Sequence, residues 1–533
     1  MKRLVALLLV LLIAFSISGC KSDTLTAEYA VYMGGGVNDG EIYYTDFRSE
    51  PFQITHNFST TMCYGKEGYI LSKRTTVHGD KVFYFDDAAT FQNFGGGAMY
   101  RGSLYYRSLS NRKSAPVKID TDVLSGFELN SEGNVLTYIK FENDKFALYQ
   151  YDLTNSTLIN SSVSTAYPDK NSGSVTYLTE SGELFLYEGG KNEKIADSVT
   201  TLKGYGEDKK AICYYSNDTL YTLKGQESTT VDTGVAFVQQ VYSSGEVYYV
   251  KKSEKQLVLM DFVEDSKTNS SLRSALKTTS PSTLFYYTLY YFDGSQKSVI
   301  ADNVVLSSIG APASDEVPLI CYTSFTLGET DKIMISEISS IAYAQDAVKE
   351  IITSATEKHF ALKGKTYTLP QNTEDYAVSP SGDTVYYYAD KTDTYNLSDV
   401  YAVSASSGQI GEPELYEKQI TNKLFFTVAG NTGYYKGGAL YFDKIKIADN
   451  VHSYSVNAET GGISVMQNFD EQSGLGTVCH MMDGRAEVLS NGASQHIMLK
   501  DRVVYIKNGN TLYLHVEGEE REIAKAARIL LAK

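Results

Sequence analysis

The chain has no tryptophan, five cysteines in 533 residues, and fewer basic than acidic side chains. The 48 Lys and Arg residues against 64 Asp and Glu residues give a formal net charge of −16. This charge argues against nucleic acid as a partner, because nucleic-acid binding needs a basic surface. The missing tryptophan weakens the case for a carbohydrate-stacking platform without excluding it. A hydrophobic fraction of 42% beside a charged fraction of 21% excludes a disordered chain.

The common catalytic motifs are also absent from the sequence. It contains no G-x-S-x-G nucleophile elbow, no H-E-x-x-H motif and no glycine-rich phosphate loop followed by Lys-Ser/Thr. The two Gly-Gly-Gly runs at 34–36 and 95–97 lack a strand–loop–helix setting, so we expect turns there. We therefore predict no catalytic residues and no cofactor.

Metal-ligand spacing is missing as well, so we predict no metal site. The acidic stretch DKTDTYNLSD at 390–399 does not match the D-x-D-x-D-G calcium loop, and we expect a solvated turn between strands. The histidines are scattered, although a repeat fold can bring distant residues together. They are His56, His78, His359, His452, His480, His496 and His515.

Four cysteines lie beyond the N-terminal segment: Cys63, Cys213, Cys321 and Cys479. Four cysteines allow two disulfides with three connectivities. However, contexts such as AICYYS and LICYTS are typical of strand interiors, and none has C-x-x-C or Cys/His metal spacing. We therefore expect buried free thiols.

The N-terminus carries the most specific motif. Lys2 and Arg3 precede the apolar run LVALLLVLLIAF at 4–15, which is shorter than the about 20 residues of a membrane span. The following ISGC, ending at Cys20, resembles the lipobox of bacterial lipoproteins. The resemblance implies a signal peptide at 1–19, acylation of Cys20 and a lipidated tether at 20–27. The alternative is an ordinary secretory signal with an incidental cysteine.

Internal repeats dominate the rest of the chain. The phrase LYYFDGSQKSVIADNV at 289–304 recurs as LYFDKIKIADNV and, more loosely, as LYEGGKNEKIADSV. Together with turns such as SPSGD at 379–383, the repeat forms a unit of four short strands in roughly 35 to 40 residues. This is about the length of one β-propeller blade. In each phrase we expect the aspartate, Asp302 in the first, to bond nearby backbone amides at the turn between blades.

The segment VSPSGDTVYYY…DVYAV at 378–403 is similar to TolB-type propeller repeats. In that family an aspartate follows the proline of the turn, whereas this chain has Ser381. The whole chain resembles the tyrosine-rich propeller lipoproteins of Gram-positive bacteria. The resemblance implies an all-β fold and an extracytoplasmic location on the cell membrane.

About 13 copies of the aromatic strand exceed the four to eight blades of one propeller. We therefore predict tandem β-propellers of four-stranded blades, with domains at 28–270 and 271–533 and a seam at 264–283. A single larger propeller with elaborated blades is the alternative. The segment 335–359 has apolar residues at helical spacing and predicts a helical insertion packed on a blade edge.

The chain has 43 tyrosines, and runs such as VYYYA place aromatic rings on both faces of a strand. Since neighbouring blades cover both faces, we interpret these tyrosines mainly as core. The expected function is non-enzymatic binding or scaffolding, with the membrane and an unknown protein, peptide or glycan as partners. The alternatives are an envelope hydrolase or lyase with a funnel active site, and a sensory domain for a membrane partner.

Replacing Cys20 with alanine should abolish acyl labelling and release or mislocalise the protein, because the lipobox thiol would be the acyl acceptor. Labelling of growing cells with a fatty-acid analogue, followed by fractionation, measures both effects. Continued labelling of the Cys20→Ala protein would refute the lipobox interpretation.

Overall fold

The computed structural model describes only part of the chain. The described residues are 28–34, 41–55, 75–94, 97–205, 211–242, 244–258, 283–304, 318–325, 356–370, 372–392, 397–405, 410–427, 429–482, 485–507, 510–526 and 528–532. The predicted signal peptide, Cys20, the tether, His56 and Cys63 lie outside these ranges, as does the predicted seam apart from Thr283.

The chain divides into two compact units. Unit 1 comprises Met1–Ser162, Asn171–Gly173 and Val451–Lys533, and unit 2 comprises Val163–Lys170 and Ser174–Asn450. These bounds differ from the predicted 28–270 and 271–533, since both ends of the chain belong to unit 1. Each unit is described below by itself.

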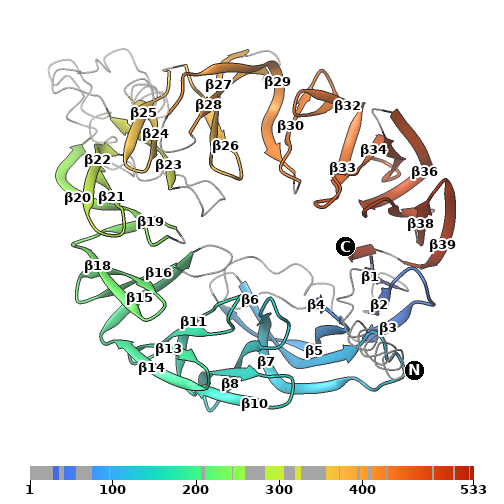
Figure 1. Cartoon of the computed structure of the whole chain (residues 1–533), viewed down its shortest axis with the longest axis horizontal. Coiled ribbons are helices and arrows are strands. Elements are labelled where there is room, and N and C mark those ends of the chain that lie inside the picture. Colours follow the sequence, from blue (N-terminus) through green and yellow to red (C-terminus); the bar gives the residue numbers. More distant parts are fainter. Residues whose placement is uncertain are drawn as a thin grey trace, which may run out of the picture. The chain divides into compact units, whose positions relative to one another are not determined.

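All regular elements in the described ranges are β-strands in antiparallel sheets, so the predicted all-β class is confirmed (Figure 1). Unit 1 contains one four-stranded and two seven-stranded sheets. The four-stranded sheet has the order β3 (Phe52–Thr55), β2 (Ile42–Thr45), β1 (Ala30–Met33), β40 (Arg528–Ala532). The first seven-stranded sheet contains β4 (Thr75–His78), β5 (Lys81–Phe94), β6 (Gly97–Ser108), β7 (Val117–Leu129), β8 (Leu136–Glu142), β9 (Lys145–Tyr151) and β10 (Ser156–Asn160). The second contains β33 (Val451–Val456), β34 (Ile463–Asp470), β35 (Leu475–Met482), β36 (Arg485–Met498), β37 (Val503–Lys507), β38 (Thr511–Val516) and β39 (Glu519–Lys525).

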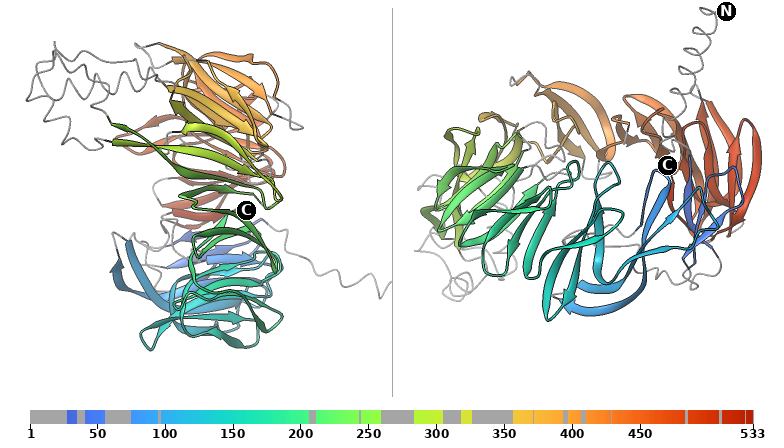
Figure 2. Two further views of the ribbon diagram at one scale, coloured as in Figure 1. Left: turned by 90° about the vertical axis from the view of Figure 1, so that its left-hand side faces the viewer. Right: turned by 60° about the horizontal axis from the view of Figure 1, so that its bottom comes forward.

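Unit 2 contains two four-stranded and two seven-stranded sheets, drawn from further directions in Figure 2. The four-stranded sheets are β11 (Val163–Pro168), β12 (Val175–Thr179), β13 (Leu184–Glu188), β14 (Lys191–Ala196), and β15 (Val199–Tyr205), β16 (Ala211–Ser216), β17 (Thr219–Lys224), β18 (Glu227–Thr233). One seven-stranded sheet contains β19 (Phe237–Val241), β20 (Val247–Val258), β21 (Thr283–Phe292), β22 (Lys297–Val304), β23 (Leu319–Phe325), β24 (Thr356–Leu362) and β25 (Lys365–Thr368). The other contains β26 (Asp375–Val378), β27 (Thr384–Thr392), β28 (Leu397–Ser404), β29 (Glu414–Phe426), β30 (Thr432–Lys436), β31 (Ala439–Phe442) and β32 (Ile445–Asp449).

Each seven-stranded sheet is two four-stranded blades that share their middle strand. The shared strand is the fourth strand of one blade and then becomes the first strand of the next. In β29, for example, Glu414 to Thr421 pair with β28, and Thr421 to Phe426 pair with β30. The sheets therefore comprise three single and four double blades, and the predicted repeat of four-stranded blades is confirmed.

A residue with positive φ marks each change of partner between blades. It is Asp122 in β7, Asn303 in β22, Gln419 in β29 and Gly492 in β36. In the three repeated phrases, the residue after the aspartate takes this conformation: Ser198, Asn303 and Asn450, with φ of 55°, 57° and 50°. Asn is one of the few residues that adopt positive φ readily. The repeated phrase is therefore a backbone turn between blades.

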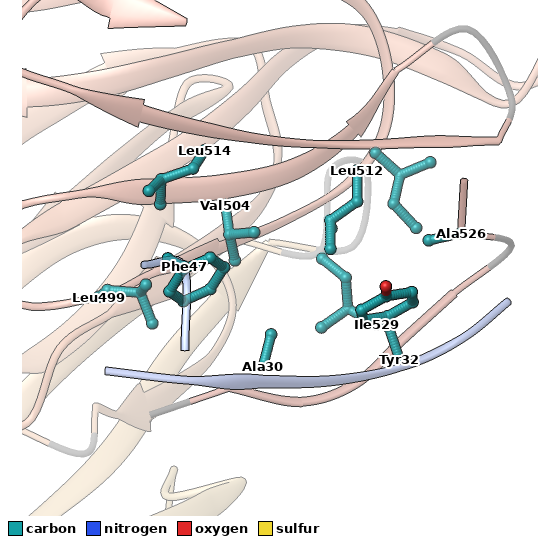
Figure 3. Close-up of a cluster of buried hydrophobic side chains, with 10 residues drawn as sticks. Ala30, Tyr32, Phe47, Leu499, Val504, Leu512, Leu514, Ala526 and Ile529 are labelled. Atoms are coloured by element: carbon teal, nitrogen blue, oxygen red, sulfur yellow. The ribbon is translucent and has the colours of Figure 1, made fainter. Parts of the chain in front are cut away.

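Strands from the two ends of the chain complete one blade of unit 1. β1 pairs with β2 on one side and with β40 on the other. Side chains from both ends share a buried cluster, in which Tyr32 and Phe47 lie with Val504, Leu512 and Ile529 (Figure 3).

Stacked aromatic pairs form the centre of most blades. A tyrosine of the second strand lies directly opposite a ring on the third strand, with ring centroids 5.0 to 6.0 Å apart. The pairs are Tyr32–Tyr43, Tyr84–Tyr105, Tyr138–Tyr149, Tyr177–Phe185, Tyr214–Tyr221, Tyr249–Tyr290, Tyr322–His359, Tyr387–Tyr401, Tyr434–Tyr441 and Tyr505–Tyr513. Each such pair adds about 0.5–1.5 kcal/mol beyond the burial of its area. The prediction that the tyrosines serve mainly as core is confirmed for the second-strand tyrosines, which are buried, whereas the third-strand tyrosines are half-buried.

The predicted helix at 335–359 is wrong at its C-terminal end. Residues 335–355 lie outside the described ranges, but Thr356 to His359 begin strand β24. Pairing of these residues with Tyr322 to Phe325 in β23 overrides the helical spacing of the sequence. Within the described ranges, no helix is long and apolar enough to cross a membrane.

The cysteines in the described ranges are buried free thiols, as predicted. They are Cys213, Cys321 and Cys479. Cys213 and Cys321 are 2% and 1% exposed, and burial raises the pKa of both thiols.

Cys213 and Cys321 should resist alkylation in the native protein, because both the access of reagent and the formation of thiolate are suppressed. Iodoacetamide treatment followed by peptide mass spectrometry should modify both residues only in urea. Modification at the same rate with and without urea would contradict the buried placement.

Candidate functional site

Four acids in the described blades each belong to a repeated cluster of one acid, one tyrosine and one lysine. The second strand of the blade supplies the sequence Tyr-x-Lys. Because side chains alternate along a strand, the tyrosine and the lysine project from the same face of the sheet. In β8, Tyr138 donates a hydrogen bond of 2.7 Å to Asp120 of β7, and Lys140 lies 2.8 Å from the same carboxylate. The lysine ammonium also lies 5.3 Å from the ring centre of Tyr149.

The same arrangement surrounds Asp232 of β18, whose side chain is 5% exposed. Tyr249 donates to it at 2.9 Å, Lys251 lies 3.2 Å away, and Lys297 of β22 lies 2.6 Å away. Burial opposes ionisation of Asp232, but these hydrogen bonds hold its pKa below its ordinary value. One carboxylate thus joins strands of two sheets in unit 2.

Two further acids have equivalent partners. Glu417 of β29 accepts from Tyr434 at 2.9 Å and pairs with Lys436 at 2.7 Å. Glu520 of β39 accepts from Tyr505 and pairs with Lys507 at 2.9 Å. Hydrogen bonds from these partners outweigh burial and lower the pKa of both carboxyls.

Three of the four acids occupy the same place in the repeat. Asp120, Asp232 and Glu417 each stand two residues before a positive-φ residue, which is Asp122, Gly234 or Gln419. Where the repeated phrase occurs instead, this place holds Ala196, Ala301 or Ala448.

These tyrosines are poor candidates for acid–base chemistry. Burial and the hydrogen bond to a carboxylate both raise the pKa of Tyr138, Tyr249, Tyr434 and Tyr505. Each hydroxyl therefore stays protonated at neutral pH and serves as a hydrogen-bond donor. We conclude that the acid–tyrosine–lysine clusters hold strands together.

A different arrangement occurs in the blade β22–β25 and is the candidate functional site. Ser324 Oγ lies 2.8 Å from His359 Nε2, and His359 Nδ1 lies 3.0 Å from Thr368 Oγ1. The imidazole stacks on Tyr322 with ring centroids 5.0 Å apart. Glu357 Oε2 lies 3.8 Å from Nε2. Burial lowers the pKa of His359, so the ring is neutral near pH 7 and can accept a proton.

A second histidine with two hydroxyl neighbours lies in unit 1. His496 Nε2 is 3.0 Å from Ser453 Oγ, and Nδ1 is 2.9 Å from Ser464 Oγ. Burial lowers the pKa of His496 to about 4. Ser464 is fully buried, so this histidine ties strands together within the core.

The remaining described histidines form no metal site. His452 stacks on Phe469 at 3.7 Å, and His480 and His515 interact electrostatically. Over the described ranges, no group of three or more His, Cys, Asp or Glu side chains is placed to hold a metal ion. The acidic stretch 390–399 joins β27 and β28, and its residues 393–396 lie outside the described ranges.

The aspartates of the repeated phrase contact side chains. Asp302 accepts from Thr288 Oγ1 at 2.9 Å, Asp197 pairs with Lys194, and Asp449 pairs with Lys446. The turn itself depends on the positive φ of the next residue. The feature that sequence reasoning missed is the pattern Tyr-x-Lys or Tyr-x-Ser on the second strand of a blade. It is visible in the printed sequence at 138–140, 214–216, 249–251, 322–324, 434–436 and 505–507.

The strand order of the blades defines the chain as a β-propeller protein. No protein-family model matches the chain, and no curated protein is detectably similar to it.

Solved structures that match this chain share little sequence with it. A eukaryotic initiation factor is matched over 94% of this chain and 100% of its own, at 6% identity and a TM-score of 0.38. The β-propeller domain of the Trilobed protease from Pyrococcus furiosus is matched over 86% and 99%, at 8% identity and a TM-score of 0.24. The chain spans 54% of the tricorn protease, which covers 95% of this chain at 12% identity and a TM-score of 0.22.

Replacing Asp232 with asparagine should lower the free energy of unfolding by about 1–3 kcal/mol at pH 7, because two lysines lose their counter-charge. We expect less than the about 3–5 kcal/mol of a fully buried pair, since both lysines are partly exposed. The pKa of Asp232 is lower in the folded protein than its ordinary value of 3.8. Its stabilisation is therefore present above that value and is lost as the pH falls through the folded pKa.

Urea unfolding of both proteins at pH 7 and at about pH 3 tests this expectation, since the difference should shrink in acid. Asp197→Asn is the matched control, because Asp197 pairs with Lys194 but its side chain is 69% exposed. The free energy of unfolding of the control should fall by less than about 1 kcal/mol. Equal losses in the two variants would show that the Asp232 cluster has no special role.

Proposed function

We propose that the protein is an extracytoplasmic lipoprotein, anchored to the bacterial cell membrane through acylated Cys20, that binds a protein, peptide or glycan through the loops of its blades. The observation that carries the proposal is the repeated four-stranded blade. Such blades form a framework whose loops vary independently of the core, which is how scaffold domains present binding residues. The lipobox-like segment supports the location.

The acid–tyrosine–lysine clusters support a binding role that uses no catalysis, cofactor or metal at these clusters. Charged groups beside the blade cores are held in acid–tyrosine–lysine clusters at Asp120, Asp232 and Glu417. Groups held in this way stabilise the framework and leave recognition to the loops.

The proposal also includes two propellers within the chain. The division into two compact units supports two bodies. Pairing of β1 with β40 gives the first body both ends of the chain.

The binding role is tested with the Cys20→Ala protein as bait, because a body without its anchor separates recognition from membrane attachment. We expect this protein to retain a specific partner from solubilised native membranes. The purified partner should raise the melting temperature of the bait, since a ligand that binds only the folded state stabilises it.

Urea-unfolded bait, carried through the same capture, controls for adhesion to exposed apolar surface. A native bait that retains nothing beyond this control, together with no thermal shift, would contradict the binding role.

A further inference from the structure

The blade β22–β25 departs from the repeat at one position, and a serine lies beside that departure. In the described blades with a stacked pair, the third strand supplies Tyr or Phe, but here it supplies His359. The residue two places after the second-strand tyrosine is lysine in the charged clusters, Ser216 in the blade β15–β18 and Ser324 here. Places where a chain breaks its own local pattern are where functional groups are expected.

The exceptional histidine and the serine beside it bring an imidazole and a hydroxyl into contact. Ser324 Oγ lies 2.8 Å from His359 Nε2, within the range of a nucleophile and its general base. If Ser324 donates to Nε2, then Nδ1 carries the ring proton and donates it to Thr368 Oγ1 at 3.0 Å. Stacking on Tyr322 fixes the plane of the ring.

The exposure of Ser324 and the charge beside His359 favour a pair of nucleophile and general base. Ser324 is partly exposed near the end of β23, whereas His359 is 7% exposed. The Glu357 carboxylate, 3.8 Å from Nε2, can stabilise an imidazolium once it forms.

We propose that Ser324 is a nucleophilic serine with His359 as its general base and Thr368 as a positioning residue, and that it reacts with acyl esters. Ser324 Oγ attacks the ester carbonyl carbon while its proton passes to His359 Nε2. The carbon–oxygen bond to the leaving group breaks, and the leaving alkoxide takes that proton and departs as an alcohol. Water then attacks the acyl-serine, its proton returns through Nε2 to Ser324 Oγ, and a carboxylic acid is released. The proposal does not rest on the binding role.

His496 provides an internal comparison. It also contacts serine hydroxyls, but both of its ring nitrogens face serines, and one of these, Ser464, is fully buried. Ser453 therefore serves as the matched control residue.

The test treats the folded full-length protein with a fluorophosphonate probe and maps the modified peptide by mass spectrometry. We expect modification at Ser324 and its loss in Ser324→Ala. His359→Phe should reduce the labelling rate by at least ~10²-fold, the usual contribution of a general base. This variant also restores the aromatic pair of the other blades, so loss of labelling is separated from loss of folding. Ser453→Ala should label like the unaltered protein.

Hydrolysis of p-nitrophenyl acetate by the same four proteins should follow the labelling. The proposal is overturned if the unaltered protein shows no modification at Ser324. It is also overturned if His359→Phe labels at the original rate.

Discussion

The stack between a second-strand tyrosine and the ring opposite it on the third strand is the contact on which most of the described blades depend. Antiparallel register places the two rings directly opposite one another, as in Tyr138–Tyr149 and Tyr434–Tyr441. Because side chains alternate along a strand, the residue two places after the tyrosine projects from the same face. That residue is Lys140 in one blade and Ser324 in another. In these blades the stack therefore determines where the polar group lies, and the charged clusters and the Ser324–His359 contact both follow from it.

Local features of the blades were predictable from the sequence, because they depend on residues close together in the chain. The turn SPSGD forms as expected, with Gly382 N donating to Ser379 O at 2.8 Å and Gly382 at a φ of 68°. The partners of the acids were not predictable, since Asp232 meets Lys297, 65 positions later. Pairing of β1 with β40 likewise joins the two ends of the chain. The composition of a strand shows that tyrosines are buried, but only the register shows which ring each one meets.

The repeated phrase was correctly predicted as a repeat, but the role expected for Asp302 differs from its contact in the structure. The aspartate attracted attention because Asp commonly bonds turn amides. In the structure Asp302 accepts from the Thr288 hydroxyl instead. The essential position is the next one, where Asn303, Asn450 or Ser198 adopts positive φ and turns the chain toward the following blade. Gly234 does the same after the Asp232 cluster. What these turns share is a backbone conformation. Comparing the sequences does not reveal it, because the residues at this position differ in type.

The repeat also supplies a reference within the chain against which departures can be judged. In the blade that begins with β33, Val465 faces Cys479 where the other blades stack two rings, and the Cys479 thiol lies 3.2 Å from Gln467 Oε1. In that blade the contact of Val465 with Cys479 replaces the stacked rings, and no titrating ring is introduced there. In the blade that ends with β25, His359 keeps the ring but adds two nitrogens, and each of them meets a hydroxyl. His359 packs as the repeat requires, and burial lowers its pKa, so the ring is neutral near pH 7 and can accept a proton. The tyrosines of the other blades lack this chemistry, because burial and hydrogen bonding to acids keep their hydroxyls protonated.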